Sequence, residues 1–262
     1  MKFALIGGKL GHSYSAIIHD LFFKLTGIKG SYELVEIPSA DNLSEKMNFF
    51  EQNGYAGINI TIPYKKDILK LANEISEEVI KLEAANTIHF SNGRRVAYNT
   101  DYFGFKRTLE LSKVDPKGQK WLVLGYGGGA KSAIAVLKDM NTEEISVSLT
   151  SQSGNMIIPF DMIGELKGYS GVVNTTPVGM YPNINNSPLS INMLNNFQTA
   201  VDIVYNPLET KFLKDAQETG LKTVKGLYML VAQAIKAQEI WQNREFSDDL
   251  IDQIYQKVGA GL

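Results

Sequence analysis

The stretch LVLGYGGGAKSA, residues 122–133, decides the fold of the second half of the chain. It places Gly125, Gly127 and Ala130 in a GxGxx(G/A) pattern between an apolar run typical of a buried strand and a helical pattern. In that setting the first glycine permits a tight turn, the second lets a pyrophosphate approach the backbone, and the helix N-terminus supplies amide donors. Glycines also occur where a helix merely packs closely on a strand, but the strand–turn–helix context favours dinucleotide binding.

The next predicted strand ends in LTSQSGN, residues 149–155, where the choice between NAD and NADP is usually made. NAD-binding proteins carry an acidic residue there, and NADP-binding proteins offer a nearby arginine. This segment has neither. The hydroxyls of Thr150, Ser151 and Ser153 could bond either a ribose hydroxyl or a phosphate, so the motif alone leaves both cofactors open.

Apolar runs alternate with helical patterns along the whole chain, which predicts an α/β fold with parallel sheets covered on both faces. A hairpin with the turn SNGR interrupts the alternation, and a helix then leads into a Pro/Gly linker. We therefore expect an N-terminal domain at residues 1–101 and a Rossmann-type domain at 102–229. The helices at about 230–262 follow the last strand of the second domain and are expected to rejoin the first.

The composition describes a soluble globular protein. The chain has 262 residues, 44% hydrophobic and 21% charged residues, a net charge of −2 and no cysteine. A nucleic-acid partner is not expected, because phosphate binding needs a concentrated positive patch. No apolar run is long enough to cross a bilayer, and the N-terminus suits a strand better than a signal peptide. We expect a cytoplasmic protein without a membrane partner.

The stretch GINITIPYKK, residues 57–66, contains a lysine pair whose members face different ways. Pro63 suits the first position of a helix and predicts one over YKKDILKLAN, residues 64–73. In that helix Lys66 shares a mostly polar face, whereas Lys65 shares an apolar face. A partly buried ammonium must be paired or have a shifted pKa, and such a lysine can act as an acid or base. The apolar face of Lys65 consists of Ile68, Leu69 and Ala72.

Four further polar residues each have a structural and a functional interpretation. Asp101 follows the hairpin and starts a helix, so it is either an N-cap or dipole-compensating residue or the partner of Lys65. Asn86, at the head of the hairpin, is a turn residue or a ligand group. Ser13 and Ser15 precede a helical pattern: Ser15 suits an N-cap, or both hydroxyls hold a small carboxylate. No metal site is expected, because metal-ligand spacing is absent from the three histidines, His12, His19 and His89.

Together these motifs resemble the shikimate dehydrogenase family over essentially the whole chain. Eight ordered segments with matching spacing are far more specific than one glycine motif. In chain order they are GHSYS, GINITIPYK, AANT, NTD, GYGGGA, NTTPVGM, DIVYNPLET and GLYMLVAQA.

The resemblance implies an N-terminal substrate domain, a Rossmann domain, and an active site in the cleft between them. It implies reversible reduction of 3-dehydroshikimate to shikimate with NADPH in chorismate biosynthesis, by a monomer or homodimer. Lys65 and Asp101 would be the catalytic pair. The implied substrate contacts are Ser13, Ser15, Thr61, Asn86, Tyr205 and Gln233. The implied cofactor contacts are Gly125, Tyr126, Gly127, Gly128, Gly129, Thr150, Ser151, Thr175, Met180 and Gly226.

The chain departs from the family pattern at a few positions. The family's Asn-Arg-Thr clamp for NADP aligns with Leu149-Thr150-Ser151, and the missing arginine removes a charge-assisted contact to the 2′-phosphate. Glu83 stands where the family has glycine, Gly8-Lys9 where it has Asn-Pro, and Ala16 where it has proline. An NAD-using quinate/shikimate dehydrogenase is therefore the near alternative, and a non-catalytic shikimate-binding sensor is the alternative from another class.

Overall fold

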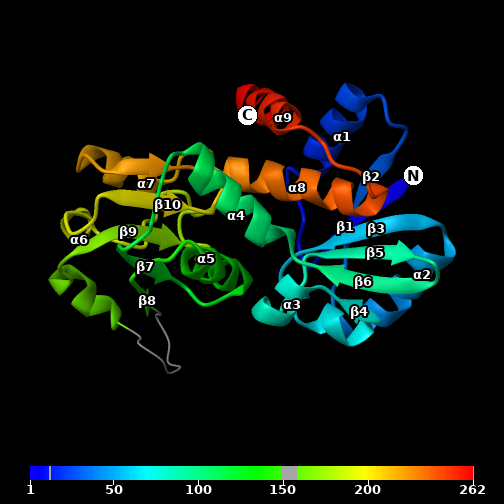
Figure 1. Cartoon of the computed structure of the whole chain (residues 1–262), viewed down its shortest axis with the longest axis horizontal. Helices are drawn as coiled ribbons and strands as arrows, with labels where there is room; N and C mark the ends of the chain where they lie inside the picture. Colours follow the sequence, from blue (N-terminus) through cyan, green and yellow to red (C-terminus); the bar gives the residue numbers. More distant parts are fainter. Residues whose placement is uncertain (12, 149–157, 262) are drawn as a thin grey trace. The chain divides into compact units, whose positions relative to one another are not determined.

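The computed structural model describes residues 1–11, 13–148 and 158–261. The chain forms two compact units: Met1–Gly104 with Leu230–Leu262, and Phe105–Met229 (Figure 1). Each unit has its own sheet, so the predicted α/β class with a Rossmann-type part is confirmed. Within the described part of the chain, no helix has the length and apolar character needed to cross a membrane.

The first unit contains a six-stranded mixed sheet in the order β2-β1-β3-β5-β6-β4. Strand β1 pairs in parallel with β2 and β3, whereas β5 is antiparallel to both β3 and β6. The antiparallel β5–β6 pair is the predicted SNGR hairpin, whereas the antiparallel pairing of β3 with β5 was not predicted. The strands are β1 (Lys2–Gly7), β2 (Ser31–Glu36), β3 (Tyr55–Ile60), β4 (Glu74–Ile75), β5 (Thr87–Ser91) and β6 (Arg94–Tyr98).

The helices of this unit cover the sheet, and those at the C-terminus belong to it. Trp241 of α8 stacks on Phe3 with ring centroids 4.7 Å apart, and its indole N–H donates to the Ile88 carbonyl at 2.9 Å. Gly57 leaves room for this indole, because a Cβ there would lie 2.0 Å from Trp241 Nε1. Helix α9 lies beside α1 (Figure 1). The helices are α1 (Ser15–Thr26), α2 (Leu43–Gln52), α3 (Glu77–Leu82), α4 (Thr100–Leu111), α8 (Leu227–Gln242) and α9 (Asp248–Ala260); α4 and α8 contain the boundaries between the units.

The second unit contains a five-stranded, wholly parallel sheet in the order β11-β10-β9-β7-β8. The chain passes from β7 to β8 on one side and then returns to place β9 on the other side of β7. This reversal makes the carboxyl end of β7 a topological switch point, where open α/β sheets bind ligands. The elements are β7 (Lys120–Leu124), α5 (Gly128–Asp139), β8 (Glu144–Ser148), β9 (Tyr169–Asn174), α6 (Ile191–Leu194), β10 (Thr199–Asp202), α7 (Lys211–Glu218) and β11 (Lys222–Val224).

Each unit buries a separate apolar core, as expected for strands that read as almost continuous hydrophobic runs. In the first, side chains of β1, β3 and α2 meet under the sheet; they include Ile6, Met47, Phe50, Ile58 and Ile60. In the second, side chains of β7 and β9 meet those of α7; they include Leu122, Leu124, Val172, Phe212 and Leu213.

The predicted helix over residues 64–73 is wrong. The Ile62–Pro63 peptide is cis, the residues that follow form turns, and only a 3₁₀-helix at Asp67–Leu71 is present. The predicted difference between the two lysines nevertheless appears, because Lys65 is half-buried and Lys66 is exposed.

Glu83 ends α3 in the left-handed conformation, with φ 50° and ψ 37°. A side chain in this region costs about 1 kcal/mol relative to glycine. We predict that Glu83→Gly is more stable than Glu83→Ala by about this amount, since both lose the same side chain and differ in Cβ. Urea unfolding of the two variants measures the difference. Equal stabilities would show that the backbone at residue 83 is not strained.

Candidate active site

One ion pair of the first unit joins Lys65 and Asp101. The Lys65 ammonium lies 2.5 Å from Asp101 Oδ2, and the two side chains are 19% and 10% exposed. Lys65 follows β3 in sequence, and its carbonyl accepts the Ala85 N–H at 2.8 Å, which ties the turn to the segment before β5. Asp101 lies in the first turn of α4, where the helix dipole favours a negative charge. The pair is thus a partly buried ion pair whose partners come from two separate backbone elements.

Asn86 holds the other oxygen of Asp101. Its Nδ2 donates to Asp101 Oδ1 at 2.9 Å, while its Oδ1 accepts the backbone N–H of Thr100 at 2.8 Å. A backbone N–H can only donate, so this contact fixes which end of the amide faces Asp101. Asn86 is buried, and its own backbone bonds to the strands on both sides, through the Tyr98 carbonyl and the Ile60 N–H.

Gln233 completes this network from α8. Its Oε1 lies 3.3 Å from both Asn86 Nδ2 and Thr100 Oγ1, and its Nε2 donates to the Leu230 carbonyl at 2.9 Å. Hydrogen bonds thus join Lys65, Asp101, Asn86 and Gln233, which are all predicted site residues. Thr100 belongs to the same network and was not predicted. Its position between Asn99 and Asp101 was visible in NTD, but nothing in that pattern shows that a threonine hydroxyl meets Asn86.

Ser13 and Ser15 form a separate pair. Ser13 Oγ donates to Ser15 Oγ over 3.1 Å and accepts the Ser15 N–H over 3.3 Å, so two hydroxyls lie side by side at the start of α1. The N-cap interpretation of Ser15 is wrong, because Tyr14 is the N-cap and Ser15 is the first helical residue. Thr61 lies directly after β3, and its N–H donates to the Ile6 carbonyl at 2.9 Å.

The glycine turn of the second unit has the geometry needed to cradle a pyrophosphate. Gly125 has φ 104°, a conformation that L side chains rarely adopt, and a Cβ there would lie 2.8 Å from Thr175 Oγ1. Gly127 is the N-cap of α5 and supplies no side-chain cap, and the N–H groups at such a helix start are typical donors to an anion. A Cβ on Gly127 would meet nothing within 4 Å, which leaves space beside the turn. The predicted residues therefore fit a dinucleotide. Tyr126 lies in this turn, Gly128 is the first residue of α5, and Thr150 and Ser151 lie outside the described residues.

The remaining predicted cofactor residues lie at the same end of the second sheet. Thr175 follows β9 and bonds through N–H and Oγ1 to the Leu124 carbonyl, at 3.0 and 2.5 Å. Met180 is 44% exposed, and the next residue, Tyr181, donates its N–H to the Asn206 carbonyl beside half-buried Tyr205. Two of the predicted glycines also meet a packing requirement: a Cβ on Gly129 would lie 2.5 Å from Ile203 Cδ1, and one on Gly226 would lie 2.6 Å from the Ile203 carbonyl.

A buried carboxylate that was not predicted ties two of these loops together. Asp202 ends β10, and its oxygens accept from Asn174 Nδ2 at 3.1 Å, Val204 N–H at 2.9 Å and Thr210 Oγ1 at 2.6 Å. Asn174 Oδ1 in turn accepts the N–H and hydroxyl of Thr176. Burial raises the pKa of Asp202 to about 6, and the three hydrogen bonds offset only part of this effect.

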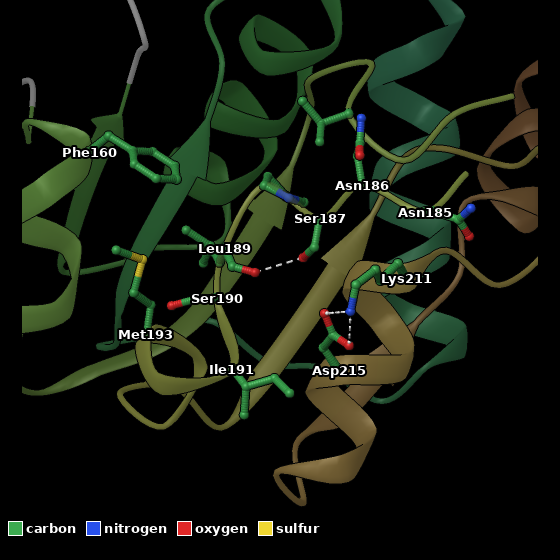
Figure 2. A pocket seen from close by; sticks show the side chains of 12 residues that line it. Phe160, Asn185, Asn186, Ser187, Leu189, Ser190, Ile191, Met193, Lys211 and Asp215 are labelled. Carbon is green, nitrogen blue, oxygen red and sulfur yellow. Dashed lines mark hydrogen bonds and ion pairs between the residues drawn. The ribbon is translucent and has the colours of Figure 1, made fainter. Parts of the chain in front are cut away.

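A surface cavity of about 580 Å³ lies elsewhere on the second unit, between the segment before α6 and α7 (Figure 2). Lys211 donates to both oxygens of Asp215, at 2.7 and 2.8 Å, so the two charges at its edge neutralise each other. Of the predicted cofactor segment, residues 175–180, Val178 lines this cavity. We therefore attribute the cavity to the way the segment before α6 packs on α7.

The two sheets, the switch point and the glycine turn define a Rossmann-type α/β protein with a second, mixed α/β unit. The family model for the shikimate dehydrogenase substrate binding domain matches residues 5–88. A shikimate dehydrogenase (NADP(+)) from Clostridium perfringens is 42% identical over 98% of this chain and 97% of its own length. The chain belongs to the shikimate dehydrogenase family.

Solved structures agree with this assignment. Shikimate dehydrogenase 1 from Peptoclostridium difficile superposes with a TM-score of 0.92 at 38% identity, covering 99% of this chain and 98% of that one. Shikimate 5-dehydrogenase from Thermus thermophilus, solved with NADP(H) and shikimate, has a TM-score of 0.87 at 28% identity, covering 98% and 99%.

The raised pKa of Asp202 predicts a specific pH dependence of stability. The folded state binds the proton more tightly than the unfolded state, so this group stabilises the fold most below its ordinary pKa of 3.8. The contribution is lost as pH rises through about 6. We predict that the difference in unfolding free energy between wild type and Asp202→Asn shifts across this range, by on the order of 3 kcal/mol. Denaturant unfolding at several pH values measures it, and a constant difference would contradict the assignment.

Proposed function

We propose that the protein is a shikimate dehydrogenase, which reversibly reduces 3-dehydroshikimate to shikimate with NADPH on the route to chorismate. The observation that carries the proposal is the Lys65–Asp101 pair at 2.5 Å, held on its far side by Asn86. Membership of the family and the glycine turn on the second sheet support it. We assign substrate binding to the first unit and cofactor binding to the second; a cytoplasmic location and a monomeric or dimeric state stay predictions.

Lys65 is the proposed proton donor. When bound, the nicotinamide supplies the hydride that reaches C3 of the substrate, and negative charge develops on the ketone oxygen. An ammonium beside that oxygen stabilises the charge and transfers its proton, so the C=O becomes CH–OH. In the oxidative direction the neutral amine takes the proton back. Asp101 keeps Lys65 oriented, and because Asp101 Oδ1 is held by Asn86, the ammonium has a defined position.

Uncharged side chains are proposed to bind the carboxylate and the hydroxyls of the substrate. The adjacent Ser13 and Ser15 hydroxyls are proposed to hold the carboxylate, as two donors side by side suit its two oxygens. Thr61, Asn86, Tyr205 and Gln233 are proposed to bond the hydroxyls or the carboxylate. The α5 N-terminus with the glycine turn, together with Thr175, Met180 and Gly226, is proposed to bind the cofactor.

One feature of the sequence favours a second candidate. Residues 149–155 carry neither the arginine that clamps a 2′-phosphate nor the acid that bonds a ribose. A quinate/shikimate dehydrogenase that accepts NAD is therefore the alternative function.

An absorbance assay of reduced nucleotide with each pairing of shikimate or quinate with NADP or NAD tests both candidates. Preferred turnover of shikimate with NADP supports the first, and preference for NAD or quinate supports the second. Shikimate binding by calorimetry without turnover in any pairing would leave a non-catalytic sensor and overturn the enzyme proposal.

The lysine pair supplies a matched test of the catalytic assignment. Lys65→Ala removes the proton donor, so we expect turnover to fall by about 10²–10⁴-fold with the thermal unfolding transition retained. Lys66 is exposed and adjacent, so Lys66→Ala is the control and should leave turnover nearly unchanged. Initial rates at saturating substrate measure both. Equally mild losses in the two variants would remove Lys65 from the mechanism.

A further inference from the structure

A continuous chain of hydrogen bonds links Tyr32 of β2 to the Lys65–Asp101 pair. Tyr32 donates its hydroxyl proton to Asn59 Oδ1 at 2.8 Å, and Asn59 Nδ2 donates to Thr87 Oγ1 at 3.0 Å. Thr87 Oγ1 donates to Asn86 Oδ1 at 3.0 Å, and Asn86 Nδ2 donates to Asp101 Oδ1. Tyr32, Asn59, Thr87, Asn86 and Asp101 are all buried.

The direction of each bond in this chain is fixed by the backbone. Asn59 Nδ2 also lies 3.2 Å from the Asn86 carbonyl, which can only accept, so Asn59 Oδ1 must face Tyr32. Thr87 Oγ1 accepts from Asn59 and keeps its single proton for Asn86. Asn86 Oδ1 must face away from Asp101, because it accepts the Thr100 N–H. Asn59 Oδ1 is therefore an acceptor, and the Tyr32 hydroxyl donates to it.

The Tyr32 ring is itself held in place by a buried histidine. His19 of α1 stacks on it with ring centroids 3.8 Å apart and an interplanar angle of 17°. Gln238 Oε1 accepts from Gln242, so Gln238 Nε2 is the donor toward His19 Nδ1 at 2.9 Å. Complete burial lowers the pKa of His19 to about 3, so the stacked ring is uncharged at neutral pH. The ring that packs on Tyr32 is therefore uncharged, and its proton lies on Nε2, because Nδ1 accepts from Gln238.

We propose that Tyr32 is a positioning residue for catalysis, whose hydroxyl anchors Asn59 and, through Thr87, supports the position of the Asn86 side chain that holds Asp101 against Lys65. The inference rests on the proposed dehydrogenase function and extends it to a residue of β2, a strand that contributes none of the predicted site residues. Without the hydroxyl, Asn59 Oδ1 loses its bond to Tyr32, and the Asn59 side chain is held less tightly against Thr87. The loosened contact reaches Asn86 through Thr87, while the backbone bonds keep both amides in the same orientation.

Tyr32→Phe tests this directly, because it removes one oxygen and keeps the ring that stacks on His19. We expect kcat for shikimate oxidation to fall about five- to tenfold, the equivalent of one buried hydrogen bond. The KM for NADP should stay unchanged, because Tyr32 belongs to the first unit. Tyr55→Phe is the matched control. Tyr55 also lies on this sheet, packs edge-on against Phe50 at 4.8 Å and donates its hydroxyl to Glu33, so its kcat should equal that of wild type.

A double-mutant cycle with Thr87→Val separates positioning from general loosening of the core. If Tyr32 acts through Thr87, the double variant loses no more kcat than the more severe single variant. Losses that multiply, or a Tyr32→Phe enzyme as fast as wild type, would overturn the inference. If Tyr32→Phe does not fold, Thr87→Val alone breaks the chain and must show the same fall in kcat at constant KM for NADP. Absence of turnover in the wild type would instead refute the proposed function.

Discussion

The hydrogen bond from the Thr100 backbone N–H to Asn86 Oδ1 is the constraint on which the candidate active site depends. An asparagine amide can turn over and exchange its donor and acceptor ends, and only a partner of fixed polarity prevents this. Because the first turn of α4 supplies that partner, Asn86 presents its NH₂ group to Asp101. Asp101 then has one oxygen occupied, and the other is directed at Lys65.

The hydrogen bonds of this network do more to fix the positions of its side chains than to stabilise the fold. Each buried hydrogen bond contributes about 0.5–1.5 kcal/mol, whereas a buried polar group without a partner costs about 1–3 kcal/mol. Asn59, Thr87, Asn86 and Thr100 avoid that cost because each has partners in the network. A change at one member leaves others unsatisfied, so the network has one favourable arrangement. That property suits a site where an ammonium must meet one oxygen of a substrate.

Local patterns predicted most of the fold and part of the site. The apolar runs located most strands, SNGR located the hairpin, and the glycine turn identified the switch-point loop, because each depends on a few neighbouring residues. The turn after Ile62 was misread as a helix, since its conformation depends on contacts such as the one between Lys65 and Ala85, 20 positions apart. Thr100, Asn59 and Asp202 were missed for the same reason. A polar residue inside an apolar strand indicates that it has a buried partner. Which residue that partner is depends on the register between the strands.

The two units use buried carboxylates in different ways, and the difference follows from their donors. Asp101 accepts from a cation, so the first unit holds an ammonium beside a carboxylate whose other oxygen is bound by Asn86. Asp202 accepts only neutral donors among the contacts described, and burial raises its pKa to about 6. It links the loops after β9 and β10 without bringing a cation to the switch point. The negative charge of a bound pyrophosphate would then be stabilised by the backbone N–H groups at the start of α5, which do not titrate. Under the proposed function, the proton donor belongs to the unit that holds Lys65, and the second unit contributes the nucleotide-binding turn.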